Sequence, residues 1–394
     1  MRPADPPPDA GERGEDVGAG DLQTAGRSGP RPEGEGSDGV AGGDQWDAAD
    51  AAAMARALEL AASVRTRTSP NPWVGCVVEH DGEWFEGATE PPGGAHAEVV
   101  ALRRAGARAR GATLYTTLEP CAHHGRTPPC VGAIRQAGVA RVVVGMTDPD
   151  PQVRGSGLAQ LRESQIAAEV GLAADQVTEL LAPYLKHRRT GLPWVVLKLA
   201  CTLDGRIAAP DGSSRWLTGT EALADAHRLR AESDAVLVGS GTVRTDDPQL
   251  TVRLGEPCVR QPLRVVLGRV PPGARVEPAL EMDGEPAAVL GALGAKGILQ
   301  VLLEGGAHVA HAFHEAGLVD RYVFYLVPAL FGGDDAVPMF RGRGAATLDG
   351  MWRGRLVSVT RLGRDLRVEL ERGADLDAAG ASAGAGAGAT AESC

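Results

Sequence analysis

The sequence predicts an α/β protein with two successive folded domains between two tails. Short apolar runs with strand character alternate with helical segments, which is typical of sheets covered by helices. A chain of 394 residues is long enough for two domains. The sequence Gly191-Leu192-Pro193 interrupts the alternation near its middle. We therefore expect domains at 46–190 and 191–372, and disordered low-complexity tails at 1–45 and 373–394.

The individual elements follow from this alternation in chain order. In the first domain we expect helices at 48–64, 97–105 and 129–137, a polar helix ending near 186–189, and strands at 73–79, 113–117 and 141–145. In the second domain we expect helices at 221–231 and 308–316, and strands at 194–199, 235–238, 263–267, 287–290, 299–303 and 322–326.

Charge and composition exclude several classes of protein. The formal net charge is −11, of which residues 1–45 contribute −6 and residues 373–394 contribute −3, so the remainder is nearly neutral. No basic stripe is present to hold nucleic-acid phosphates. The sequence has no run of about 18 apolar residues, so it predicts no membrane span. The first residues lack the apolar core of a signal peptide. Six scattered cysteines do not make a disulfide framework. We expect a cytoplasmic protein.

The clearest chemical signal is a set of potential zinc ligands. His96-Ala97-Glu98 is followed by Pro120-Cys121 and then by Cys130. One imidazole and two thiolates suffice for a catalytic zinc site with an open position, where a bound water has a pKa of about 7. This order is the signature of zinc deaminases, in which the Glu transfers protons and binds no metal. We predict His96, Cys121 and Cys130 as ligands and Glu98 as the catalytic acid/base.

Two alternatives remain for this motif, and its spacing is unusual. The cysteines are either incidental or part of a closed structural site with His123 or His124 as a fourth ligand. Cys130 follows Cys121 by nine positions, whereas nucleoside and nucleic-acid deaminases use a shorter Pro-Cys-x-x-Cys. The insert contains His123, His124 and Arg126. It either receives a phosphate or ribose group or forms a structural loop.

Two glycine clusters mark the second domain. Gly239-Ser240-Gly241-Thr242 and Glu304-Gly305-Gly306-Ala307 each follow an apolar strand. Bare backbone at a strand-to-helix turn suits a phosphate, although such turns are also common packing points. The Gly-x-Gly-x-x-Gly pattern of a simple dinucleotide-binding fold is absent after the opening strand.

These motifs together resemble a known family. The segments 69–75 and 120–130 are similar to the deaminase half of the bifunctional riboflavin-biosynthesis deaminase–reductases, and 198–206, 214–218, 229–235 and 241–253 are similar to the reductase half. The resemblance covers about residues 50–370. It implies a cytidine-deaminase-like three-layer α/β/α domain followed by a dihydrofolate-reductase-like α/β domain that uses NADPH.

The resemblance also implies individual site residues. Asn71 would contact the pyrimidine, unless Pro70-Asn71-Pro72 is merely a turn. Thr89 stands where family members often carry a His, seven residues before the zinc-binding His. The implied substrate-binding residues are Ser214, Arg230, Leu250, Arg253 and Glu304. The implied cofactor-binding residues are Ala200, Trp216, Thr242, Asp246, Gly306, Ala307, His308, Val309, Ala310, His311 and Ala312.

Two of these implied roles have a physical rationale. Arg230 and Arg253 suit two-pronged binding of a ribose 5-phosphate, although surface salt bridges are the alternative. Reduction of an open-chain sugar imine needs a hydride at carbon and a proton at nitrogen. Asp246 is the candidate proton donor, and Lys198 is the runner-up.

The expected function is therefore bifunctional. With one zinc ion, the first domain would deaminate 2,5-diamino-6-(5-phosphoribosylamino)pyrimidin-4-one. With NADPH, the second would reduce the ribosyl group, giving 5-amino-6-(5-phosphoribitylamino)uracil. We expect small-molecule substrates and a homo-oligomer, without nucleic-acid or membrane partners. The alternatives are a nucleoside or tRNA deaminase fused to a non-catalytic binding module, and a zinc-stabilised assembly protein without activity.

Overall fold

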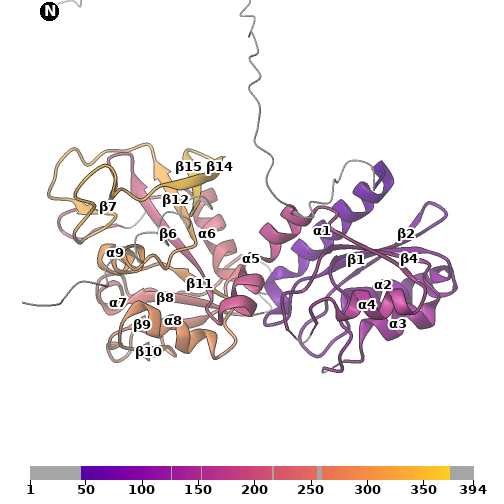
Figure 1. Ribbon diagram of the computed structural model, residues 1–394. Helices are drawn as coiled ribbons and strands as arrows, with labels where there is room; N and C mark the ends of the chain where they lie inside the picture. The colour runs from indigo at the N-terminus through magenta and orange to yellow at the C-terminus, as the bar shows by residue number, and fades with distance from the viewer. Residues whose placement is uncertain (1–45, 126, 152, 215–216, 255–259, 373–394) are drawn as a thin grey trace, which may run out of the picture. The chain divides into compact units, whose positions relative to one another are not determined.

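The computed structural model describes residues 46–125, 127–151, 153–214, 217–254 and 260–372 (Figure 1). The expected tails at 1–45 and 373–394 lie outside these described residues, as do Arg126 and Trp216. The described chain forms one five-stranded sheet, one eight-stranded sheet and a small two-stranded sheet. None of the described helices is long and apolar enough to cross a membrane.

The five-stranded sheet belongs to the first part of the chain and has the order β2-β1-β3-β4-β5. Strand β1 pairs antiparallel with β2 and β3, whereas β3, β4 and β5 run parallel. The strands are β1 Gly75–His80, β2 Glu83–Ala88, β3 Thr113–Leu118, β4 Arg141–Met146 and β5 Ala167–Val170. The helices are α1 Ala48–Thr68, α2 Ala97–Ala105, α3 Cys130–Ala137, α4 Ser156–Glu163 and α5 Ala174–Thr190, with a 3₁₀ turn at Gly106–Ala109.

Alternating side chains divide this sheet into two buried faces. Val77, Tyr115 and Val143 pack in a cluster with Met54 and other residues of α1. Their neighbours Val78 and Val142 point the other way, into a cluster with residues of α2, α3 and α4. Figure 1 shows α1 on one side of the sheet and α2, α3 and α4 on the other. The expected three-layer α/β/α architecture is confirmed.

The eight-stranded sheet has the order β10-β9-β8-β11-β6-β12-β15-β14. The strands from β10 to β12 are parallel, and the hairpin of β14 and β15 adds an antiparallel edge. The strands are β6 Trp194–Thr202, β8 Ala235–Gly239, β9 Leu263–Leu267, β10 Leu280–Met282, β11 Gln300–Leu303, β12 Arg321–Val327, β14 Gly354–Leu362 and β15 Asp365–Arg372. Strands β7 Arg206–Ala208 and β13 Val337–Pro338 form the small sheet.

Helices cover both faces of this second sheet as well. One face packs against α8 Pro286–Gly294 and α9 Ala307–Glu315, and the other against α6 Thr220–Glu232 and α7 Ser240–Asp246. The central strand β11 shows the alternation directly. Val301 and Leu303 belong to the first cluster and Leu302 to the second, and all three are fully buried.

The sequence-based prediction of a strand at 287–290 is wrong. These residues lie in α8, which begins at Pro286, a residue favoured in the first helical turn. Val289, Leu290 and Leu293 are buried on one face, as the helical period requires. A short apolar run has no periodicity that separates a buried strand from a buried helix.

The other predicted elements are present with boundaries shifted by a few residues. Several short or polar elements were not predicted, namely β2, α4, β5, β7, α7, β10, β13, β14 and β15. Strand β14 shows the reason. Most of its residues are exposed or only half-buried, so it lacks the apolar run that identifies a strand.

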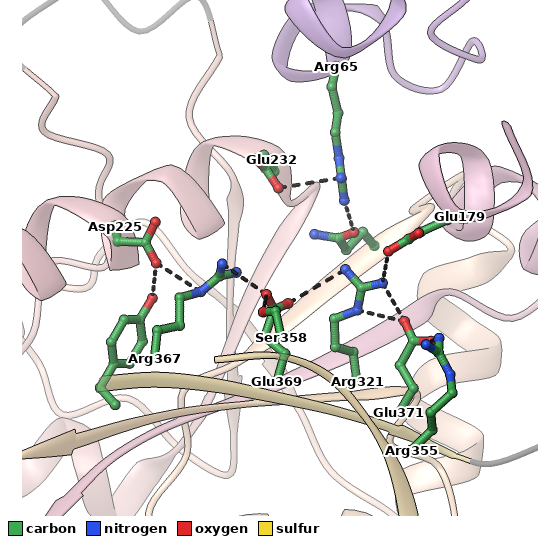
Figure 2. A network of polar contacts seen from close by, with 12 residues as sticks. Arg65, Glu179, Asp225, Glu232, Arg321, Arg355, Ser358, Arg367, Glu369 and Glu371 are labelled. Atoms are coloured by element: carbon green, nitrogen blue, oxygen red, sulfur yellow. Dashed lines mark hydrogen bonds and ion pairs between the residues drawn. The ribbon is translucent and has the colours of Figure 1, made fainter. Parts of the chain in front are cut away.

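Polar side chains link α1 and α5 to the second sheet (Figure 2). The guanidinium group of Arg65 donates to the side-chain oxygen of Gln300 at 2.9 Å and lies 3.6 Å from Glu232. Arg321 on β12 lies 3.8 Å from Glu179 of α5, and Lys186 of α5 pairs with Asp320 at 2.6 Å. Helices α1 and α5 are therefore joined to the second part of the chain by ion pairs and a hydrogen bond as well as by the chain itself.

The approach of α1 to β1 leaves no room for a side chain at Gly75. A Cβ there would lie 1.9 Å from the carbonyl oxygen of Ala57. We expect Gly75→Ala to lower the free energy of unfolding by at least about 1–3 kcal/mol, because overpacking forces the backbones apart. Gly291→Ala in α8 is the matched control, since nothing lies within 4 Å of that position, and it should be neutral or slightly stabilising. Urea denaturation measures both, and equal effects would contradict this packing.

Candidate active sites

The three predicted zinc ligands meet beside the carboxyl end of β3. His96 is the N-cap of α2, Cys130 is the first residue of α3, and Cys121 lies in the loop after β3. The Nδ1 atom of His96 lies 3.5 Å from the sulfur of Cys121 and 3.3 Å from that of Cys130. Among the described residues, these are the ones whose ligand atoms gather within 4.8 Å of one another. Neither His123 nor His124 joins that group.

The donor set fits zinc. A tetrahedral ion with bonds of roughly 2.0–2.1 Å to nitrogen and 2.3 Å to sulfur holds such donors about 3.5 Å apart. The Cys130 thiol and the His96 ring lower the pKa of Cys121 to about 4. The same pairing raises the pKa of Cys130. One thiolate therefore exists at neutral pH, and metal binding would release the second proton.

Glu98 lies beside these ligands in the first turn of α2. Its side chain is buried, and burial raises the pKa of Glu98 to about 7, with the charge of Cys121 adding to the effect. A carboxyl group with a pKa near neutrality can both accept and donate a proton at physiological pH. This placement matches the role predicted from the sequence.

Two supporting residues were not predicted from the sequence. Thr127 places its hydroxyl 3.2 Å from Nε2 of His96, while Nδ1 faces the two cysteine sulfurs and could bind a metal there. The buried carboxylate of Glu119 accepts hydrogen bonds from the backbone N–H groups of Gly155, Gly157 and Leu158 at the start of α4, and from Asp148. Glu119 thereby anchors the loop that carries Cys121. The only sequence signal was its position two residues before that cysteine.

A cavity of about 240 Å³ opens beside two of the three ligands, His96 and Cys121. Asn71, Thr89 and His123 line it together with His96, Glu98 and Cys121. Thr89, which departs from the family pattern, is buried, and its hydroxyl exchanges hydrogen bonds with the backbone of Val74. The residue thus closes the wall of the cavity and keeps its polar atom satisfied.

The far wall of this cavity carries a second polar group that the sequence did not indicate. Asp148 follows β4 and accepts a hydrogen bond from the Tyr184 hydroxyl at 3.1 Å. Burial raises the pKa of Asp148 to about 6. Asp150 and Arg188 line the same wall. These residues lie far apart in sequence, so spacing alone did not reveal them.

The second sheet carries two neighbouring cavities that share Thr218 and Asp246. The larger, of about 660 Å³, is lined by most of the implied cofactor residues, including Ala200, Thr242, Asp246 and Gly306–Val309, as well as Ser214 and Glu304. The smaller, of about 380 Å³, is lined by Arg230, Leu250 and Arg253. The fold therefore brings the two implied sets together at the carboxyl ends of β6, β8 and β11.

Three implied cofactor residues are not in that lining. Ala310 is fully buried in the core cluster of α8 and α9. The Nε2 atom of His311 lies 3.2 Å from a carboxylate oxygen of Glu315. The His311 ring also packs against Gly342 and leaves no space for a side chain there. Neither these two nor Ala312 belongs to the described wall of the larger cavity, because the helical turn carries the chain away after Val309.

Arg230 was expected to bind a phosphate through two nitrogens, but its guanidinium group is already occupied by other groups of the protein. Its Nε and one terminal nitrogen bind both oxygens of Glu304 at 2.5 and 2.9 Å, and the other donates to the carbonyl of Thr251. Burial alone would raise the pKa of Glu304, but the charges of Arg230 and Lys198 hold it at about 2. Arg253 pairs with no carboxylate among the described residues and donates to Gln249 and Thr251. Arg253 therefore keeps more of its charge available for an anion than Arg230 does.

The remaining candidates also face these cavities. Leu250 adopts a left-handed backbone conformation, with φ of 53°, while its side chain is buried. Such strain in a branched residue is concentrated at functional sites. Lys198 lies 3.9 Å from Glu304, and burial lowers the pKa of Lys198. Asp246 ends α7 between the two cavities.

Comparisons with known proteins agree with this geometry. The cytidine and deoxycytidylate deaminase zinc-binding region matches residues 47–146, and the RibD C-terminal domain matches residues 193–368. The riboflavin biosynthesis protein RibD of Escherichia coli is 41% identical over 76% of this chain and 91% of its own length. The chain belongs to the family of bifunctional riboflavin-biosynthesis deaminase–reductases. The corresponding protein of Mycobacterium tuberculosis is 44% identical over 81% of this chain and 96% of its own length.

Solved structures show the same two-domain arrangement of folds. RibD of Acinetobacter baumannii has a TM-score of 0.78 at 38% identity and covers 82% of this chain and 99% of its own. A deaminase/reductase of Thermotoga maritima has a TM-score of 0.76 at 34% identity, with the same coverage. Because the family includes a zinc-binding deaminase domain and a reductase domain, its cofactors are zinc and NADPH. These matches extend over both domains. They decide against a non-catalytic binding module as the second domain and against an assembly protein without activity.

The anchoring by Glu119 leads to a prediction about metal affinity. Glu119→Ala should weaken zinc binding by about 10- to 100-fold, because four backbone N–H groups lose their acceptor and the Cys121 loop loosens. Competition with a chelator measures this affinity. Glu163→Ala, at the exposed end of α4, is the control and should keep the affinity of the unmodified protein. Unchanged affinity in Glu119→Ala would show that the loop is held by other contacts.

Proposed function

We propose that this enzyme performs two consecutive steps on one substrate skeleton. The first domain deaminates 2,5-diamino-6-(5-phosphoribosylamino)pyrimidin-4-one at C2. The second reduces the ribosyl group, giving 5-amino-6-(5-phosphoribitylamino)uracil. The observation that carries the proposal is that Asn71 and buried Glu98 line one cavity with His96 and Cys121. Cys130 completes the group of potential zinc ligands with these two residues. We propose 46–190 and 191–372 as the bounds of the two domains.

In the deaminase, His96, Cys121 and Cys130 would hold zinc, which when bound supplies an activated water at neutral pH. Glu98 accepts a proton from that water and delivers it to the amino group leaving from C2. Water and the amine thereby become a C2 carbonyl group and ammonia. Asn71, which lines the same cavity, orients the pyrimidine ring.

In the reductase, Thr242 and the Gly306–Val309 turn would hold NADPH in the larger cavity, where backbone N–H groups at the start of α9 suit its phosphates. When bound, NADPH would supply the hydride for reduction of the open-chain sugar imine. The proton for the imine nitrogen comes from Asp246, which faces both cavities, with Lys198 as the second candidate. Arg253 binds the substrate phosphate.

We also propose a cytoplasmic homo-oligomer. Several apolar side chains are exposed on the β14–β15 hairpin and the segment before it, and contiguous exposed apolar surface is typical of an interface. These residues are Leu348, Met351, Leu356, Val359 and Leu366.

Replacing the proposed proton carrier tests the deaminase directly. Glu98→Gln should lower the deamination rate by about 10²- to 10⁴-fold, because the amide cannot transfer the proton. Its zinc content and its reductase rate should not change. Ammonia release and metal analysis measure the first two, and loss of NADPH absorbance measures the third. A Glu98→Gln enzyme that deaminates at the normal rate would contradict the proposal.

Replacing the proposed phosphate partner tests the reductase. Arg253→Ala should raise the reductase KM for its substrate by about 10- to 100-fold, because a charge-assisted hydrogen bond is lost. Deamination should remain nearly intact. Arg269→Ala, on an arginine with 80% of its side chain exposed, is the control and should change neither activity. Collapse of both activities in folded Arg253→Ala protein would rule out separate sites.

A further inference from the structure

The deaminase cavity has an unusual balance of charge. Four carboxylates line it, those of Glu98, Glu119, Asp148 and Asp150. Among the described lining residues, one side chain carries a permanent positive charge, that of Arg188. The proposed substrate carries a phosphate, and a phosphate beside several carboxylates needs a cationic partner.

Arg188 is held in place at this wall. Its guanidinium carbon lies 5.0 Å from the centre of the Tyr184 ring, on the preceding turn of α5. The hydroxyl of Tyr184 in turn donates to Asp148, so the ring that supports Arg188 is itself fixed. A planar guanidinium stacked on an aromatic ring loses less conformational freedom when it binds an anion.

The present partners of Arg188 leave part of its binding capacity unused. Its Nε lies 3.6 Å from Oδ2 of Asp150, which is an ion pair but too long for a hydrogen bond. That Nε is buried and has no hydrogen-bond partner among the described residues. A buried N–H group without an acceptor is unfavourable, so the present neighbours of Arg188 do not satisfy all of its donors.

We propose that Arg188 determines the specificity of the deaminase cavity by binding the 5′-phosphate of its substrate. This proposal rests on the proposed deaminase function. Arg188 contacts the phosphate by charge-assisted hydrogen bonds and stays out of the proton transfers at the zinc-binding residues. It therefore acts on substrate binding and on the preference for phosphorylated over unphosphorylated pyrimidines.

The test compares two substrates in the full-length zinc-loaded protein. Deamination is measured with the phosphoribosylamino pyrimidine and with the same compound lacking its 5′-phosphate. Arg188→Met should raise KM for the phosphorylated compound by about 10- to 100-fold and leave kcat within about twofold. For the unphosphorylated compound, kcat/KM should stay within about twofold of that of the unmodified protein.

Two further variants sharpen the comparison. Arg188→Lys keeps the charge without the planar fork and should recover part of the lost preference. Arg189→Met removes the neighbouring, exposed arginine of the same helix and should change neither substrate. Ribose 5-phosphate should inhibit the unmodified deaminase competitively and inhibit Arg188→Met at least about tenfold more weakly.

Equal losses for both substrates in folded Arg188→Met protein would overturn the proposal, because Arg188 would then shape the cavity without reading the phosphate. An unchanged KM for the phosphorylated compound would overturn it as well. If the unmodified protein deaminates neither compound, the proposed function itself fails, and that outcome is separate from the effect of Arg188.

Discussion

Both candidate sites depend on one structural constraint. In each sheet, the loops that lead from parallel strands into helices lie at the same edge. Side chains at the carboxyl ends of neighbouring parallel strands meet at the same edge of a sheet, where helix N-termini add unpaired N–H groups. In the first domain, Cys121 follows β3 and Asp148 follows β4, while Cys130 begins α3. In the second domain, Gly239 ends β8 and Glu304 follows β11. The candidate site residues are therefore concentrated where the backbone supplies unpaired N–H groups as hydrogen-bond donors.

Buried charges around these edges are neutralised locally. Glu119 is surrounded by backbone N–H groups, and Glu304 is bound by Arg230 with Lys198 nearby. Removing one partner of such a group leaves an unpaired buried charge, which is strongly unfavourable. These contacts therefore fix the positions of the loops, and the charges of Arg230 and Lys198 also keep the pKa of Glu304 low. The zinc-binding loop and the cofactor cavity each contain one such carboxylate.

The proposed phosphate-binding arginines of the two domains have different surroundings. In the reductase, Arg230 is bound to Glu304, whereas Arg253 pairs with no carboxylate among the described residues. In the deaminase, Arg188 stands beside acidic groups with one N–H unsatisfied. Among the described lining residues, the deaminase cavity has Arg188 as its one permanent cation, whereas the smaller reductase cavity has Arg230, Arg253 and Arg275. A separate contact joins the two domains. Arg65 donates a hydrogen bond to Gln300, the first residue of β11, and Glu304 directly follows that strand (Figure 2).

The sequence by itself indicated the α/β class, the longest helices, most of the central strands, the potential zinc ligands and Glu98, because these depend on local periodicity and on residues spaced closely in one motif. It did not reveal the helical state of 287–290, since a short buried run has no distinguishing period. Only the tertiary structure decided that Glu119 anchors the ligand loop, that Arg230 is occupied by Glu304 and that Arg188 faces the deaminase cavity. Each of these contacts joins residues from elements far apart in the chain, and their identity depends on which strands become neighbours in the sheet.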